Sequence, residues 1–348
     1  MKKLGWSLLF LLALSGVAAA APSGTLLVLN KSDDTVSFID LANNEVKATL
    51  PTGDGPHEVA VSTDGRTAVV TNYGDTEKPG KTLTVVDVPG KKVVRTIDLG
   101  NYSRPHGIVW LQGDEVAVTV EASKALLIVG VNEGKVKHAI ATDQVGTHMV
   151  AVSPKHHRAF TANIGSGSTT VIDLSLHQRI TDVVTGKGAE GIAVAPDGSE
   201  VWVTNREANT VSIVDPATLK IIATLEPGKM PIRVKFTPDG TRALVSNAIS
   251  GDVAVFDAVT KKQITSIPMQ KEGERMPQDD TKRMASQFGT GPVPVGILMP
   301  DALSLAFVAN TNADTITVID LASLKIVNRL KAGREPDGLG YSVLTIKK

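Results

Sequence analysis

The chain has 348 residues with 36 basic and 36 acidic side chains, so its formal net charge is zero. This balance argues against a nucleic acid or an anionic membrane surface as a partner. The chain contains no cysteine, which excludes thiol nucleophiles, iron–sulfur clusters and covalent attachment of a c-type haem.

The first twenty residues have the pattern of a secretory signal. Two lysines precede an apolar run from Leu8 to Leu14, and Ala18 to Ala20 are the small residues that a signal peptidase accepts. The run is too short to span a bilayer permanently, and we expect no membrane span in the mature chain. We predict a signal peptide at 1–20, a mature chain at 21–348, and a periplasmic or secreted location in a bacterium.

After the signal, one pattern returns seven times: an apolar strand ends in Asn, and a second strand ends in Asp about ten residues later. The closing residues of the second strand lie at intervals of 47, 43, 43, 42, 42 and 63 residues. These residues are Asp40, Asp87, Gly130, Asp173, Asp215, Asp257 and Asp320. A repeat near 42 residues that consists only of strands predicts a β-propeller.

Each repeat divides into four strands. In the fifth repeat these are residues 188–195, 200–205, 210–215 and 219–225, apolar or alternating segments separated by Gly, Pro, Asn and Asp. No segment after residue 20 has a helical pattern. We therefore predict an all-β fold, a single seven-bladed β-propeller domain built from four-stranded antiparallel blades.

The ends of the chain predict how the ring closes. The mature chain begins with a second strand at Leu26 to Asn30, and the missing first strand stands alone at the far end, within residues 335–346. The N- and C-terminal strands should therefore share one blade, which leaves no exposed strand edge.

The repeats resemble a known family. VVTN ending at Asn72 and VWVTN ending at Asn205, each followed by a strand that ends in an aliphatic pair and Asp, are similar to the YVTN-type β-propeller repeats of YncE-like bacterial proteins. The resemblance covers the mature chain and implies the seven-bladed fold. It also implies relatives among the propellers of quinoprotein amine dehydrogenases and of nitrite reductases that hold a d-type haem, but fold alone does not define function.

The repeat also predicts which side chains meet in the centre. The innermost strand of each blade borders the central channel, and the residue after its opening Pro, or the equivalent residue, should face a common funnel. We call these seven residues the inner ring; they are His57, His106, His148, Glu190, Ile232, Val295 and Asp337.

Three consecutive blades place a histidine in the inner ring. His57, His106 and His148 together are candidates for binding a transition metal, for ligating a haem, or for general-base chemistry. Alternatively, each histidine caps the start of its strand through a backbone hydrogen bond.

Charged residues complete the predicted funnel. Glu190, Arg233 and Asp337 lie at or beside the inner ring, and Arg104 is a further cation on this side. Histidine, carboxylate and guanidinium groups together suit a small anion or acid–base chemistry. The same charges are also compatible with a merely hydrated channel.

Two long loops are expected on the funnel face. An insertion at about 268–293 carries Met269, Met276 and Met284, which suggest either copper ligands or an adaptable apolar cover. The loop from Tyr73 to Lys81 should form the opposite wall. Such loops commonly act as lids or docking elements.

The repeated Asn and Asp have a structural explanation. Both side chains readily bond the backbone of the turn that follows them, so their recurrence does not require a catalytic role. We expect each of them to cap its own turn.

Three functions remain open from the sequence. The preferred one is an exported, soluble monomer that binds a periplasmic protein or a small molecule through the histidine-bearing face. The second is a metal or haem protein with His57, His106 or His148 as ligands. The third is an enzyme of the propeller lactonase kind, with His148 as base and Glu190 or Arg233 polarising an anionic substrate.

Overall fold

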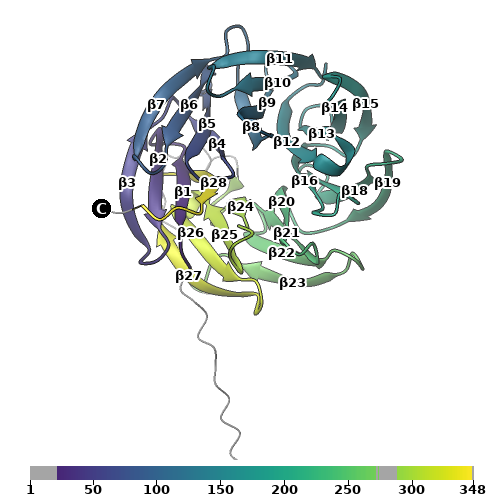
Figure 1. Ribbon diagram of the computed structural model, residues 1–348. Helices are drawn as coiled ribbons and strands as arrows, with labels where there is room; N and C mark the ends of the chain where they lie inside the picture. The colour runs from purple at the N-terminus through teal and green to yellow at the C-terminus, as the bar shows by residue number, and fades with distance from the viewer. Residues whose placement is uncertain (1–21, 272, 274–287, 347–348) are drawn as a thin grey trace, which may run out of the picture.

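A computed structural model describes residues 22–271, 273 and 288–346. Seven four-stranded antiparallel sheets surround one central axis (Figure 1). This confirms the predicted seven-bladed β-propeller. The signal predicted at 1–20 and most of the insertion predicted at 268–293 lie outside the described residues. Among the residues that the structure describes, no helix is long and apolar enough to cross a membrane.

In six blades the strands run from the channel outward in chain order, and in the first blade the C-terminal strand takes the innermost place. The innermost strands are β28 (Pro336–Ser342), β4 (Pro56–Val61), β8 (Pro105–Trp110), β12 (Thr147–Ser153), β16 (Ala189–Val194), β20 (Pro231–Phe236) and β24 (Pro294–Leu298). The second strands are β1 (Thr25–Asn30), β5 (Thr67–Gly74), β9 (Glu115–Val120), β13 (Arg158–Asn163), β17 (Val201–Asn205), β21 (Arg242–Asn247) and β25 (Leu305–Asn310).

The outer half of each blade follows the same order. The third strands are β2 (Thr35–Asp40), β6 (Pro79–Asp87), β10 (Ala125–Gly130), β14 (Ser168–Asp173), β18 (Thr210–Asp215), β22 (Asp252–Asp257) and β26 (Thr315–Asp320). The outermost strands are β3 (Glu45–Pro51), β7 (Lys92–Asp98), β11 (Lys135–Ala141), β15 (Gln178–Val184), β19 (Lys220–Leu225), β23 (Gln263–Pro268) and β27 (Lys325–Lys331). Two short 3-10 turns, Pro154–His156 and Thr311–Ala313, are helical segments that the repeat pattern did not predict.

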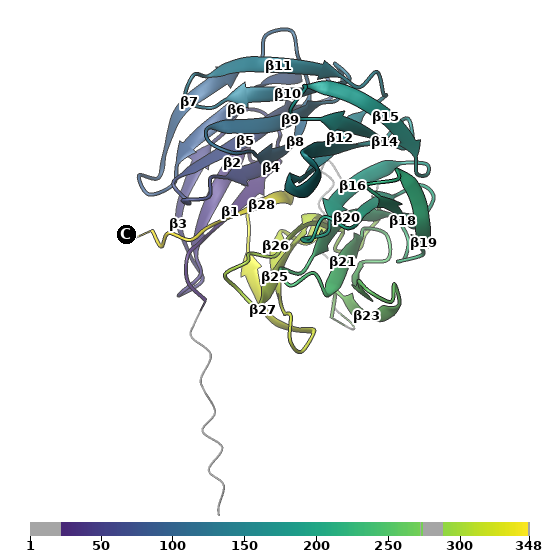
Figure 2. The same cartoon turned by 45° about the vertical axis from the view of Figure 1, so that its right-hand side comes forward.

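The hydrophobic core is divided among the spaces between blades. Seven clusters of buried apolar side chains each join two neighbouring sheets, as in the cluster of β5 and β6 with β9 and β10. The tilted views show the sheets stacked face to face around the ring (Figure 2). Because each middle strand is covered on both faces, it reads as a continuous apolar run, as in Leu26 to Leu29.

The repeated Asp caps its own turn, as expected. The carboxylate of Asp173, for example, accepts bonds from the backbone N–H groups of Ser175 and Leu176. The repeated Asn does not cap the turn that follows it, so that expectation was wrong. The amide group of Asn205 donates instead to the hydroxyls of Thr210 and Ser212 on the neighbouring strand, at 3.0 Å each.

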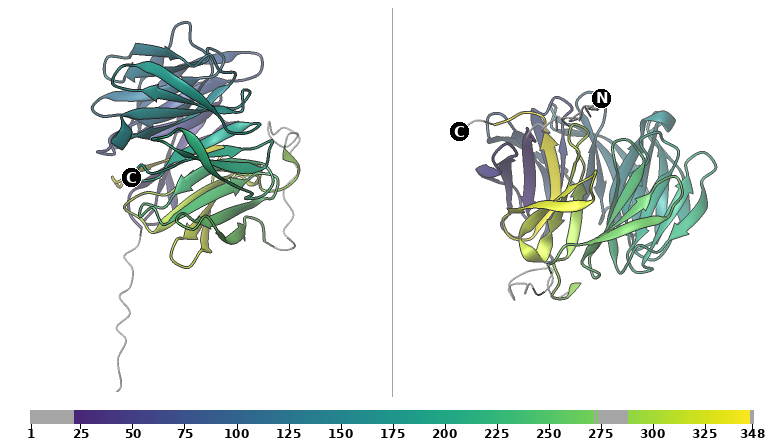
Figure 3. Two further views of the ribbon diagram at one scale, coloured as in Figure 1. Left: turned by 90° about the vertical axis from the view of Figure 1, so that its right-hand side faces the viewer. Right: turned by 90° about the horizontal axis from the view of Figure 1, so that it is seen from below.

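The ring is closed by both ends of the chain in one sheet, in the order β28-β1-β2-β3. Strands β28 and β1 pair antiparallel, with Thr25 opposite Ser342 and Val28 opposite Leu339. Figure 3 shows the purple N-terminal strands beside the yellow C-terminal strand. Leu339 also packs into the apolar cluster between the first and seventh blades, so this strand joins two blades as well as completing one.

Deletion of residues 335–348 is expected to destabilise the whole ring, because it removes β28 and exposes the edge of β1. We expect the melting temperature to fall by roughly 10 °C or more, measured by circular dichroism. Truncation after Ile346, which leaves β28 whole, is the control. A deletion variant that melts within about two degrees of the intact chain would contradict the role given to this strand.

Candidate functional site

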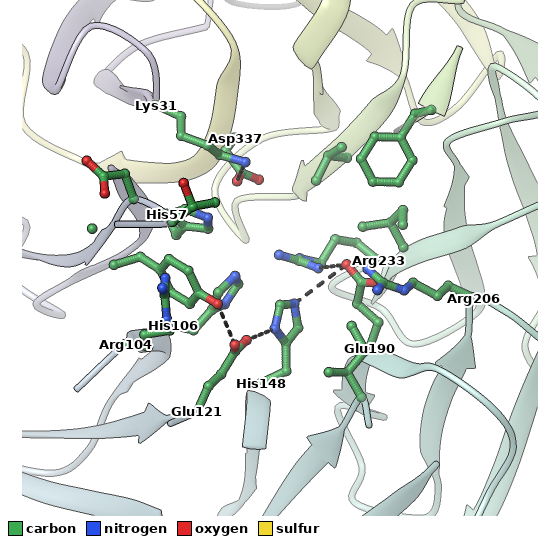
Figure 4. Close-up of a pocket in the computed structure, with 18 of the residues that line it drawn as sticks. Lys31, His57, Arg104, His106, Glu121, His148, Glu190, Arg206, Arg233 and Asp337 are labelled. Carbon is green, nitrogen blue, oxygen red and sulfur yellow. Dashed lines mark hydrogen bonds and ion pairs between the residues drawn. The ribbon is translucent and has the colours of Figure 1, made fainter. Parts of the chain in front are cut away.

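All seven inner-ring residues line one cavity of about 820 Å³ at one end of the channel (Figure 4). The structure therefore brings together the candidates His57, His106, His148, Glu190, Arg233 and Asp337. Arg233, one residue beyond the inner ring, also points into the channel and lines a second cavity of about 460 Å³ toward the other end.

A local irregularity positions the inner ring. Near the start of each innermost strand the pairing register shifts, for example between Pro105 and Ile108. Such bulges redirect the side chains that they contain. The residue after the ring position is Gly in four blades, and a Cβ at Gly191 would lie 2.2 Å from the carbonyl oxygen of Ile232 in the next blade. Glycine thus permits the close approach of neighbouring inner strands at the channel.

A second layer of cavity residues follows the repeated Asn at the end of each second strand. We call it the outer ring; its cavity-lining members are Lys31, Tyr73, Glu121, Ile164 and Arg206. Sequence reasoning did not assign a site role to Lys31, Glu121 or Arg206. The repeat pattern could have identified them, because these residues share one position of the repeat, directly after the strand end that faces the funnel.

Ion pairs connect the two rings. Lys31 lies 2.6 Å from Asp337, and Arg206 lies 2.9 Å from Glu190. Deeper in the channel, Arg233 lies 2.7 Å from Glu58 and 3.5 Å from Glu190. Each of these buried carboxylates is therefore paired with a positively charged side chain.

His148 lies between two of the carboxylates (Figure 4). Its Nδ1 contacts Glu121, and its Nε2 lies 3.5 Å from Glu190. Burial opposes the charged form of His148, but the two carboxylates raise its pKa above the usual value. Burial likewise opposes ionisation of Glu190, yet His148 and the neighbouring arginines lower the pKa of Glu190 to about 2.

The other two histidines have a different electrostatic environment. Burial, helped by the charge of Lys31, lowers the pKa of His57 to about 3. Burial and the neighbouring His148 hold the pKa of His106 well below its ordinary value. The imidazole groups of His57 and His106 are therefore neutral at physiological pH, and the neutral imidazole is the form that ligates metals.

The three histidine side chains lie next to one another, His57 edge-on to His106 and His106 tilted against His148. The ring centroids of His57 and His106 lie 4.8 Å apart, and those of His106 and His148 lie 3.7 Å apart. Nδ1 of His57 donates a hydrogen bond to the carbonyl oxygen of Gly55, at 2.8 Å, as the strand-cap interpretation expects. The Nδ1 of His106 has no such bond, and in the described part of the chain it is buried without a hydrogen-bond partner.

The rim of the cavity is formed by loops and by Arg104. Residues 74–77, within the loop predicted as a wall, line the cavity together with Phe288. Arg104 lies over the ring of Tyr73, with its guanidinium carbon 4.9 Å from the ring centre. Within the described residues, no carboxylate lies within 4 Å of the Arg104 guanidinium.

The copper interpretation finds no support in the described part of the insertion. Met269 is buried in the core between the sixth and seventh blades and does not line the cavity. Met276 and Met284 lie outside the described residues.

Comparison with protein families places this geometry in a known class. The family model described as a cytochrome D1 heme domain matches residues 101–274, half of the chain. The model described as a YNCE-like beta-propeller matches residues 16–117. The chain belongs to this group of YncE-like and cytochrome d1-type β-propellers, as its repeats indicated. No curated protein matches it.

Solved structures share the fold at low sequence identity. Hydrazine synthase of Kuenenia stuttgartiensis is 19% identical, with a TM-score of 0.69 over 91% of this chain and 100% of its own. A functionally unknown protein from Desulfotomaculum acetoxidans is 13% identical, with a TM-score of 0.71 over 92% of this chain and 99% of its own. At these identities the likeness shows the fold alone.

The residues of the funnel do not fit the haem that the family name implies. An axial histidine must direct a free ring nitrogen into a flat apolar slot. His106 and His148 are buried against each other, and both nitrogens of His148 face carboxylates. His57 is more exposed, but it is packed between Tyr73 and His106 with Lys31 and Asp337 nearby.

Replacing Arg233 with Met is expected to destabilise the protein by about 3–5 kcal/mol, because it leaves Glu58 and Glu190 buried with less positive charge. Chemical denaturation measures this loss. The double variant with Glu58→Gln should recover part of the stability, since the two residues are directly paired. If the double variant lost as much stability as the two single variants together, the pairing of Arg233 with Glu58 would be contradicted.

Proposed function

We propose that this protein is an exported binding module that holds a small anionic molecule in the cavity at the histidine-bearing end of its channel. The cavity of about 820 Å³ has the size of small-molecule sites. Its lining combines charged and polar side chains with the apolar residues Ile164, Ile232, Phe288 and Val295, a mixture that is typical of ligand pockets.

The observation that carries this proposal is the position of Arg104. The buried acids Glu121, Glu190 and Asp337 each face a cation, a histidine or a hydroxyl of the channel. Arg104 lines the same cavity and, among the described residues, has no carboxylate partner. A guanidinium that is held over an aromatic ring and left without a carboxylate is a natural contact for an anion.

The enzymatic alternative receives less support. A general base needs a free nitrogen within reach of its substrate, whereas His148 is buried with carboxylates at both ring nitrogens. Arg233 is 4% exposed and is paired with Glu58. Neither His148 nor Arg233 is therefore accessible to a lactone substrate in the way that the lactonase hypothesis requires.

Binding is tested with a thermal-shift panel of small anions: succinate, citrate, glycerol phosphate and adenosine monophosphate. We expect at least one of them to raise the melting temperature in a saturable manner. Arg104→Gln should weaken its binding about tenfold to a hundredfold, as the loss of a charged hydrogen bond does. Higher salt should also weaken it.

Arg66→Gln is the matched control, because Arg66 is exposed in the turn between β4 and β5, at the opposite end of the blade. It should leave binding unchanged. A panel in which no anion shifts the melting temperature, or in which both variants behave alike, would overturn the proposal.

Export rests on the sequence of residues 1–20 and is tested separately. When the full chain is expressed in a Gram-negative host, we expect it in the periplasmic fraction with Ala21 as its first residue, because cleavage one residue later would place Pro22 after the scissile bond. N-terminal sequencing of the fractionated protein decides the matter. Retention of residues 1–20 would contradict cleavage.

A further inference from the structure

Where the two rings meet between the third and fourth blades, three possible metal ligands lie together. One ligand atom each of His106, Glu121 and His148 can be chosen so that all three atoms lie within 4.8 Å of one another. His106 and His148 are 3% and 8% exposed, and the Glu121 side chain is 13% exposed. The cluster is thus enclosed but still borders the cavity.

The surroundings of these three side chains hold them in place. One carboxylate oxygen of Glu121 contacts Nδ1 of His148, and the other accepts a hydrogen bond of 2.6 Å from the hydroxyl of Tyr73. On its far side, His148 directs Nε2 toward Glu190. Metal sites commonly have this arrangement, in which a ligand histidine is oriented by a carboxylate at its second nitrogen and a ligand carboxylate is itself hydrogen-bonded.

One buried atom of the cluster has no other role in the described structure. Nδ1 of His106 is inaccessible and has no hydrogen-bond partner among the described residues. A buried polar atom without a partner costs about 1–3 kcal/mol. A bond to a metal ion, directly or after a small rotation of the ring, would remove that cost.

The set of donors indicates the kind of ion. Two imidazole nitrogens and one carboxylate oxygen suit divalent first-row transition metals, whereas calcium and magnesium prefer oxygen alone. Three protein ligands also leave coordination positions open. With bonds of about 2.1 Å, ligand atoms at a tetrahedral angle lie about 3.4 Å apart. The most widely spaced pair, which is no more than 4.8 Å apart, therefore needs to close by at most about 1.4 Å.

We propose that His106, Glu121 and His148 bind one divalent first-row transition metal ion, whose open positions face the cavity. The ion would add positive charge on the same cavity as Arg104. This inference deepens the proposed function. It rests on that function only in the role given to the ion, which is to hold an anionic ligand. Tyr73 and Glu190 are positioning residues of the site.

The test uses the full chain after treatment with a chelator and dialysis. Calorimetric titration with Zn²⁺ should show one ion bound per chain, and Co²⁺ should give absorption bands in the visible range. Glu121→Gln should lower the Zn²⁺ affinity more than a hundredfold, and Tyr73→Phe about tenfold to a hundredfold. Tyr73→Phe should also change the Co²⁺ spectrum, which a purely structural role would not do.

His138→Ala is the matched control for binding at the surface. His138 is exposed on β11 and stacks on His177, with 3.6 Å between ring centroids, so this pair is another possible site for added metal. The His138 variant should keep the affinity and the Co²⁺ spectrum of the unmodified chain. Circular dichroism verifies that each variant is folded, and the Co²⁺ spectrum of Tyr73→Phe provides an answer if Glu121→Gln does not fold.

Absence of one-to-one Zn²⁺ binding, or equal affinity in folded Glu121→Gln, would overturn the metal site. The anion panel, run once in the presence of chelator and once with added Zn²⁺, separates the two proposals. If an anion binds but Zn²⁺ does not, the proposed function stands and the metal site is removed. Binding of Zn²⁺ without any anion supports the metal site and removes the proposed function.

Discussion

The site depends on a hydroxyl group that links neighbouring blades. The second strand carries Thr or Ser at four blade boundaries, directly before the repeated Asn or, in the third blade, before Val120. The hydroxyl of this residue donates to the carbonyl of the inner-ring residue in the next blade. These bonds run from Thr71 to His106, from Thr119 to His148, from Thr204 to Ile232 and from Ser246 to Val295. The same hydroxyls accept a backbone N–H from their own inner strand. Each hydroxyl thus serves a buried donor and a buried acceptor at the bulge, where the regular ladder leaves both without partners.

Because this link uses only the backbone of the inner-ring residue, the bond between blades does not depend on the side chain at that position. At these four boundaries the carbonyl oxygen of the inner-ring residue is directed toward the previous blade, and this leaves its side chain on the channel side. The residue type at the ring position is therefore free to vary, as it does from His106 to Ile232 to Val295, without loss of the bond between blades. A propeller can thus keep its fold while the chemistry of its funnel changes.

The repeat made the fold and the inner ring predictable from sequence. Strand patterns give the blade, the period gives the number of blades, and equivalent positions must face the same axis, so His57, His106 and His148 could be grouped although they are 49 and 42 residues apart. What the repeat does not encode is which side chains pair across it. The contacts of Glu121 with His148 and Tyr73 depend on the third blade, where Val120 and Glu121 stand in place of the Asn and its neighbour. The partner of each repeated Asn was also missed, because local turn chemistry favours a cap and the neighbouring strand competes for the amide.

The same constraint explains why the histidines are neither simple caps nor equivalent ligands. His57 bonds a carbonyl at the start of its own strand and behaves as a cap. His148 occupies the same position of the repeat, yet it lies between Glu121 and Glu190, whose carboxylates raise its pKa, whereas the pKa values of the other two histidines are lowered. The difference arises in the outer ring, which supplies Tyr73 beside one histidine and Glu121 beside the other. Because each inner-ring residue is fixed by its backbone, its protonation and its binding capacity are set by the side chain that the neighbouring strand end places next to it.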